Sequence, residues 1–139
     1  MEMKISIFKT SLISDPARKI NKFRLAAKWA LGQDWKKDGS LNIVFMDSKE
    51  MRALNKKFLG HDYDTDVISF PYDEKPAFGD IFVSVPQAKR QATQIGHSLL
   101  AEILTLIIHG VLHLRGYRDD KPALKKKMFK EQDRLLKLL

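Results

Sequence analysis

The chain has 139 residues, which is long enough for one domain with a sizeable hydrophobic core. It contains no cysteine, so disulfide bonds, thiolate metal ligands and a cysteine nucleophile are excluded. Its formal charge of +8 favours polyanionic partners such as nucleic acid, although solvated lysines on helix surfaces explain this charge equally well.

The first third of the chain predicts a strand, a helix and a second strand. Residues 3–8 and 41–46 are the strands, and the first of them alternates apolar and polar side chains. Between them, the sequence at 14–16 (Ser-Asp-Pro) is typical of a helix start with proline at an early position, and Gly32 ends the helix. The predicted buried stripe of this helix is Ile20, Phe23, Ala27, Ala30 and Leu31.

A second helix is predicted to begin after Asp47, which forms a capping-box pattern with Glu50, and to end at Gly60. Two further strands follow at 65–70 and 80–85. The loop between these strands contains proline and glycine and is short enough for a hairpin, so the pair is predicted to be antiparallel. The predicted inward face of the helix is Met51, Leu54 and Phe58.

Three helices are predicted in the last third of the chain. The first starts at Pro86 and runs to about residue 95. The second follows Ser98 and covers 99–115; it is apolar almost all round, which is typical of a helix at the centre of a domain. The third begins near Pro122. Its predicted inward residues are Leu124, Met128, Phe129, Leu135 and Leu136.

The element order βαβαββααα predicts the α+β class, with a small mixed four-stranded sheet packed by helices. No linker or composition shift divides the chain, so we expect one domain over residues 1–139. The N-terminus does not have the pattern of a signal peptide, and the most apolar stretch is too short to span a bilayer. These features favour a cytoplasmic protein without a membrane partner.

The central helix carries a predicted metal site at its end. His109 and His113 are four residues apart, so both imidazoles lie on one face of the helix. Gly116 can adopt positive φ and turn the chain back, which lets Asp119 reach the same point. Two nitrogens and one oxygen with a fourth position open are typical of a catalytic metal site rather than a closed structural one.

The spacing is that of the zinc helix H-E-x-x-H-x-x-G-x-x-H, with two changes. Gly110 stands where a metalloprotease has its glutamate base, which argues against peptide hydrolysis, and Asp119 stands where the third histidine would be. Asp120 is a rival third ligand, one residue out of register. A structural histidine pair without metal is the remaining alternative; it predicts that chelation changes neither stability nor activity.

A second group of polar residues lies on or beside the third predicted strand. Thr65, Asp66 and Ser69 would line a cleft on one interpretation and form a polar strand edge on the other.

Taken together, these two segments resemble the YbeY family of metal-dependent endoribonucleases. The family signature H-G-x-L-H-L-x-G-Y-D-H corresponds to residues 109–119, and the match covers nearly the whole chain in element order. A second signature, L-N-x-x-[FY]-R-x-x-D-x-x-T-D-V-L-S-F, is matched at Leu54, Asn55, Phe58, Asp62, Thr65, Asp66, Val67, Ser69 and Phe70.

The resemblance implies a cytoplasmic endoribonuclease specific for single-stranded RNA, acting in maturation of the 3′ end of small-subunit rRNA and in ribosome quality control. The implied partners are single-stranded RNA, rRNA and the ribosomal small subunit. The implied cofactor is one Zn²⁺ per chain, held by His109, His113 and Asp119. Because a carboxylate replaces the third histidine, iron or another divalent transition metal also suits the ligand set.

Leu59 is a second departure, since the family usually has an arginine there that suits phosphate binding. We expect His61, Arg115 or Arg118 to take over RNA binding. Asp66 is the candidate catalytic base. The rival functions are a non-catalytic ribosome-assembly factor with a structural metal and a metal-dependent hydrolase of another substrate; metal-dependent RNA cleavage separates them from the nuclease.

Overall fold

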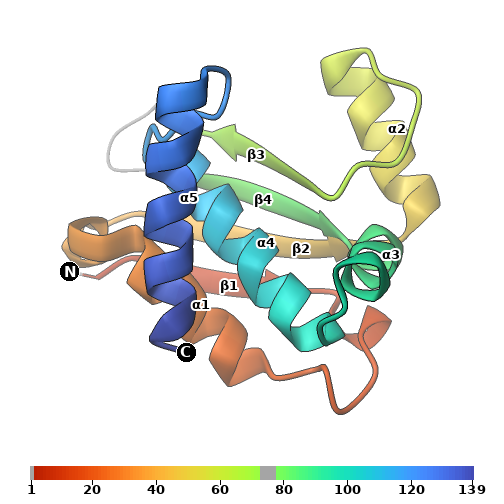
Figure 1. Cartoon of the computed structure of the whole chain (residues 1–139), viewed down its shortest axis with the longest axis horizontal. Coiled ribbons are helices and arrows are strands. Elements are labelled where there is room, and N and C mark those ends of the chain that lie inside the picture. Colours follow the sequence, from red (N-terminus) through yellow and green to blue (C-terminus); the bar gives the residue numbers. More distant parts are fainter. Residues whose placement is uncertain (1, 73–77) are drawn as a thin grey trace.

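The computed structural model describes residues 2–72 and 78–139. In these residues a four-stranded sheet is covered by helices, as Figure 1 shows. The sheet order is β1-β2-β4-β3; β1, β2 and β4 are parallel, and β3 is antiparallel to β4. The predicted mixed sheet and its antiparallel pair are therefore confirmed. The strands are β1 (Lys4–Phe8), β2 (Ser40–Met46), β3 (Val67–Pro71) and β4 (Gly79–Ser84).

The helices lie mainly on one face of the sheet. Figure 1 shows α4 crossing that face, with α5 in front of it and α1 below, while α2 and α3 lie at one end of the strands. The α-helices are α1 (Ile20–Leu31), α2 (Ser48–Leu59), α3 (Val85–Ile95), α4 (Leu99–Leu114) and α5 (Pro122–Lys137). Two short 3₁₀ helices are η1 (Thr10–Leu12) and η2 (Gly32–Lys36).

Helix α4 is the central helix, as its sequence predicted. It packs against α1, α3, α5, β3 and β4, so apolar residues are needed on most of its circumference. Together with α1, β2 and β4 it supplies most of the hydrophobic core of the domain. Its fully buried side chains include Ile103, Ile107, Ile108, Val111 and Leu112.

The predicted caps are confirmed at two helices. The Asp47 carboxylate accepts from the Glu50 N–H at 2.8 Å, and the Glu50 side chain accepts from the Asp47 N–H at 3.3 Å. The Ser98 hydroxyl accepts from the Ala101 N–H at 3.0 Å and opens α4. Gly60 ends α2 with a φ of 72°, which glycine adopts without steric cost.

Three predictions on local structure are wrong. Ile20, predicted in the buried stripe of the first helix, is 38% exposed at the first residue of α1. The sequence at 14–16 does not start a helix: the Ala17 N–H donates to the Ser14 carbonyl at 3.1 Å, so these residues form a turn, which contains a cis Asp15–Pro16 peptide, and α1 begins at Ile20. Phe58 does not point inward, since 56% of it is exposed. Asn55 is buried on that helix instead. Its amide donates to the Tyr63 carbonyl at 2.9 Å and so connects α2 to the following loop.

Within the described residues, no single helix is long and apolar enough to cross a membrane. Helices α3 and α4 meet the length and composition criteria only when counted together, and they are bent by 114° where they join.

Candidate metal centre

Two histidines near the C-terminal end of α4 are oriented by hydrogen bonds from outside that helix. The His109 Nδ1–H donates to Oε1 of Gln132 on α5 at 2.9 Å. The His113 Nδ1–H donates to the backbone carbonyl of Tyr117 at 3.1 Å. Since both Nδ1 atoms act as donors, the Nε2 atom of each ring is the nitrogen left to bind a metal. The two Nε2 atoms lie next to each other.

The carboxylate of Asp119 completes this group. The two Nε2 atoms are 3.0 Å apart, and Oδ2 of Asp119 is 3.7 Å from Nε2 of His109 and 3.4 Å from Nε2 of His113. In a tetrahedral site with zinc–ligand bonds near 2.1 Å, neighbouring ligand atoms are about 3.4 Å apart. The three side chains could therefore hold a metal ion without large rearrangement.

The electrostatics of the site also suit a cation. The pKa of His109 lies below the ordinary histidine value. Burial is the largest cause of this lowering; the hydrogen bond to Gln132 raises the pKa, and the nearby His113 lowers it. His109 is thus held in the neutral form that binds metals. The two Nε2 atoms are close enough at 3.0 Å to share one cation.

Gly116 brings Asp119 back to the histidines. It has a φ of 97°, in the left-handed region, and its N–H donates to the His113 carbonyl at 3.0 Å. The positive φ predicted for Gly116 is confirmed. Asp120, the rival ligand, lies in an ion pair with Arg118, which lowers the pKa of that carboxyl. Among the residues that the structure describes, the metal-competent group contains Asp119 and not Asp120.

Gly110 lies where α4 comes closest to the sheet. A Cβ atom at this position would be 2.9 Å from Cγ2 of Ile81, a contact closer than side chains tolerate. The Ser69 hydroxyl donates to the Gly110 carbonyl at 3.0 Å. The glycine that stands in place of a protease base is therefore explained by packing.

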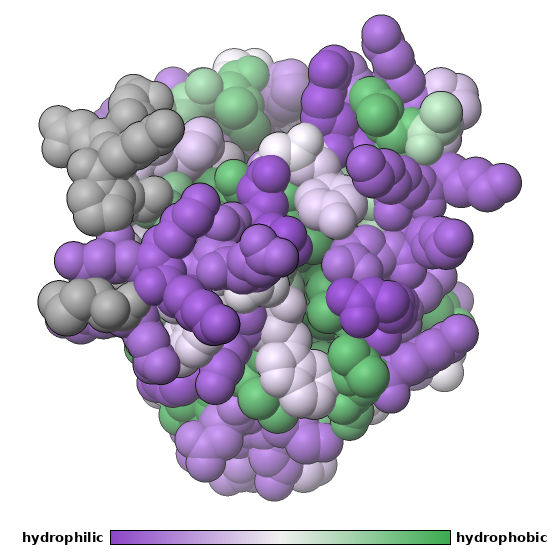
Figure 2. Space-filling view, turned by 90° about the vertical axis from the view of Figure 1, so that its left-hand side faces the viewer, coloured by the Kyte–Doolittle hydropathy of each residue, from purple (hydrophilic) through white to green (hydrophobic). Residues whose placement is uncertain are grey.

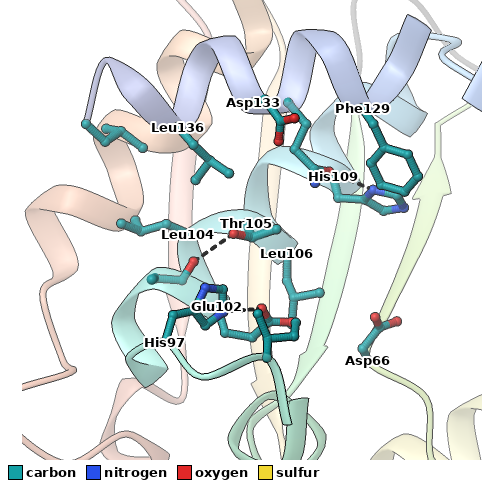
Figure 3. Close-up of a pocket in the computed structure, with 14 residues that line it drawn as sticks. Asp66, His97, Glu102, Leu104, Thr105, Leu106, His109, Phe129, Asp133 and Leu136 are labelled. Carbon is teal, nitrogen blue, oxygen red and sulfur yellow. Dashed lines mark hydrogen bonds and ion pairs between the residues drawn. The ribbon is translucent and has the colours of Figure 1, made fainter. Parts of the chain in front are cut away.

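Two cavities adjoin the histidines. The larger, of about 660 Å³, is lined by His109 and Asp66 among others and lies between α4 and α5; we call it the α4–α5 cavity. Figure 3 shows Asp66 on the opposite side of this cavity from His109. The smaller cavity, of about 330 Å³, is lined by Asn55, Leu59, His61, Tyr63, Thr65, Val67, Ile68, Ser69 and His113. Thr65, Asp66 and Ser69 therefore line cavities, which agrees with the cleft interpretation of these residues rather than with a polar strand edge.

The three candidate RNA contacts are placed differently. His61 lines the cavity that contains His113, and its ring stacks on Tyr63 with centroids 5.3 Å apart. Arg118 is exposed and paired with Asp120. Arg115, in contrast, donates to the Ala30 carbonyl at 2.9 Å at the end of α1. The structure thus brings His61 to the histidine pair and directs Arg115 toward α1.

The sequence reasoning missed Gln132, the residue that orients His109. It is buried on the inward face of α5. The available signal was a polar side chain within the apolar stripe of an amphipathic helix, because such a side chain requires a hydrogen-bond partner inside the fold.

Comparison with known proteins gives a consistent result. The sequence profile of the family described as "Endoribonuclease YbeY" matches residues 9–139. A protein of that name from Elusimicrobium minutum is 40% identical over 140 residues, covering 96% of this chain and 98% of its own length. Another from Chlorobium phaeovibrioides is 35% identical and covers 99% of this chain and 91% of its own length.

A solved structure shows the same fold. The solution structure of TM1509 from Thermotoga maritima superposes with a TM-score of 0.68 at 26% sequence identity. The match covers 95% of this chain and 86% of the Thermotoga chain.

Proposed function

The chain belongs to the YbeY family of endoribonucleases, and from this premise we propose that it is a metal-dependent endoribonuclease that cleaves single-stranded RNA and matures the 3′ end of small-subunit rRNA. The observation that carries the proposal is the convergence of two imidazole nitrogens and one carboxylate oxygen beside two cavities. Such a site offers three protein ligands and an open position, as catalytic metal centres do.

We propose that His109, His113 and Asp119 hold one Zn²⁺, the ion implied by the family resemblance. When bound, the ion would supply a Lewis acid for the phosphate and would acidify a water molecule. The donor set of two imidazoles and one carboxylate also accommodates iron or another divalent transition metal. Gln132 and the Tyr117 carbonyl keep the two rings in the orientation that such an ion needs.

The remaining roles fall to residues around the cavities. Asp66 is the proposed general base, because its carboxylate lines the cavity that contains His109. His61 and Arg118 are proposed RNA contacts. Figure 2 shows a largely hydrophilic face with small apolar patches between the polar residues. Exposed cations on α5, which would bind the phosphate backbone, include Lys127, Lys130, Arg134 and Lys137.

We further propose that the protein works in the cytoplasm as a single domain over residues 1–139 and that the ribosomal small subunit is its partner. The basic charge of +8 supports this proposal, since rRNA is a polyanion.

The test is cleavage of a single-stranded RNA by wild type and by His113→Ala, purified in parallel so that contaminating ribonucleases appear in both. We expect cleavage by wild type alone, lost on chelation and restored by zinc. Equal cleavage by both proteins, or by neither, would contradict the nuclease and favour a non-catalytic assembly factor.

A further inference from the structure

The α4–α5 cavity extends well beyond the candidate metal centre. Figure 3 shows His109 and Phe129 at one end of this cavity and His97 with Glu102 at the other. Glu102 precedes His109 by seven residues on α4, which is two turns and about 10 Å along the helix axis. The cavity therefore has room for a group that is attached to a phosphate at His109 and reaches away from it.

The far end of the cavity contains a buried, fully hydrogen-bonded carboxylate. Glu102 is only 3% exposed, yet its Oε1 accepts from the His97 Nε2–H at 2.7 Å and its Oε2 accepts from the Gln91 amide at 2.7 Å. A buried carboxylate is costly without such partners. The His97 side chain that pairs with Glu102 is 33% exposed.

The charge of the lining argues against a phosphate inside the cavity. Among the described residues that line it, none is lysine or arginine, whereas three are carboxylates: Asp66, Glu102 and Asp133. The walls are largely apolar, and its volume of about 660 Å³ is within the range of small-ligand sites. A flat heterocycle with hydrogen-bond donors at its edge fits these walls better than an anion does. The apolar wall residues include Leu104, Leu106, Phe129 and Leu136.

We propose that the α4–α5 cavity binds the nucleobase of the nucleotide adjacent to the cleaved phosphodiester, with the edge of the base toward the carboxylates that line the cavity. This inference rests on the proposed ribonuclease function. The phosphates stay outside, on the basic surface. Because the carboxylates of Asp66 and Asp133 line the cavity and accept hydrogen bonds, the site prefers bases with an exocyclic amino group, namely adenine, cytosine or guanine, over uracil.

A matched pair of variants tests the cavity. Thr105 lines it, and its hydroxyl donates to the Ala101 carbonyl at 2.8 Å. Thr93 makes the same type of bond, to the Lys89 carbonyl at 3.1 Å, but is exposed on α3 and outside the lining. Thr105→Phe fills the cavity one turn before His109 on α4, so its zinc affinity is measured beside that of wild type, and Thr93→Phe adds the same ring elsewhere.

The substrates are short single-stranded RNAs of uridines with one cytidine, in which the cytidine or an abasic residue is moved stepwise along the chain. In wild type we expect one position, next to the cleaved bond, where loss of the base lowers kcat/KM about tenfold, as loss of base stacking does elsewhere. Cytidine is preferred over uridine there. Thr105→Phe is about tenfold slower on intact RNA and no longer distinguishes it from the abasic RNA, while Thr93→Phe behaves as wild type.

The inference is overturned if no position responds to base removal, or if Thr105→Phe slows the intact and abasic RNAs equally. The abasic RNAs are tested on wild type, so the first of these outcomes does not depend on how well Thr105→Phe folds. If Thr105→Phe does not fold, Thr105→Leu replaces it as a smaller substitution. If no protein cleaves RNA, fluorescence anisotropy with the same RNAs separates the two proposals. Binding that depends on the base and on Thr105 supports the base site, although the nuclease proposal fails. Binding that depends on neither refutes the base site.

Discussion

At the scale of single residues, the candidate centre depends on which nitrogen of each imidazole carries the proton. His113 is fixed by a backbone carbonyl, whereas His109 depends on the side chain of Gln132. The two rings therefore differ in how easily mutation can turn them. The backbone contact is part of the turn at Gly116, but the amide contact is removable.

We expect Gln132→Leu to weaken zinc binding 10- to 100-fold, because His109 loses the acceptor that sets its tautomer and ring orientation. Competition with a chromogenic chelator measures the affinity. Gln94→Leu, the same change at an exposed position on α3, is the control and should leave zinc affinity unchanged. Equal zinc affinity for Gln132→Leu and wild type would show that Gln132 does not orient the ring.

Leu59 is the second informative residue. It is half exposed at the end of α2 and lines the cavity that contains His113. We expect Leu59→Arg to raise RNA affinity several-fold and to steepen the salt dependence of binding by about one unit of log–log slope, because one more phosphate is neutralised. Anisotropy titrations at several salt concentrations measure both quantities. Leu59→Gln tests whether polarity without charge is sufficient, and an unchanged slope for Leu59→Arg would place position 59 away from the RNA.

At the scale of elements, the contact between α4 and the sheet sets the position of both histidines. We expect Gly110→Ala to destabilise the fold by about 1 to 2 kcal/mol, since overpacking against the buried Ile81 outweighs the better helix propensity of alanine. It should also weaken zinc binding, because α4 must move away from β4. Chemical denaturation and chelator competition measure the two effects.

Gly60→Ala is the comparison for that variant. Its φ of 72° makes alanine unfavourable, but no atom lies within 4 Å of the new Cβ, so it strains only the end of α2. It should lower stability and leave zinc affinity unchanged. Loss of zinc affinity in both variants would mean that general destabilisation, and not the position of α4, controls the site.

Element periodicity and capping residues were sufficient to predict the strands, most of the helices, the antiparallel pair and the central place of α4, because these features depend on residues close in sequence. The three residues that could hold a metal lie in a run of eleven residues, and their convergence was predicted for the same reason. The turn at 14–17, the exposed Phe58, the Gln132 contact and the Arg115 bond to Ala30 were missed. The Gln132 and Arg115 bonds join segments that are distant in sequence. The turn at 14–17 competes with a helix start.

At the scale of the whole molecule, the candidate centre joins three segments: α4 supplies the imidazoles, the connection after it supplies Asp119, and α5 supplies Gln132. An ion bound there is a cross-link within the fold. Metal binding should therefore stabilise the native state and leave the unfolded chain almost unaffected.

We expect zinc at a hundred times its Kd to add about 2.7 kcal/mol to the free energy of unfolding, because ligand binding to the native state alone stabilises it by this amount. Thermal unfolding followed by circular dichroism, with zinc or with chelator, measures the shift. His113→Ala should lose the zinc-dependent shift, and His61→Ala should keep it, since His61 is outside the metal-competent group. A structural histidine pair predicts instead that zinc leaves the unfolding of wild type unchanged. Stabilisation without RNA cleavage would identify a metal that only holds the fold, and stabilisation together with cleavage lost in His113→Ala would place both effects in one centre.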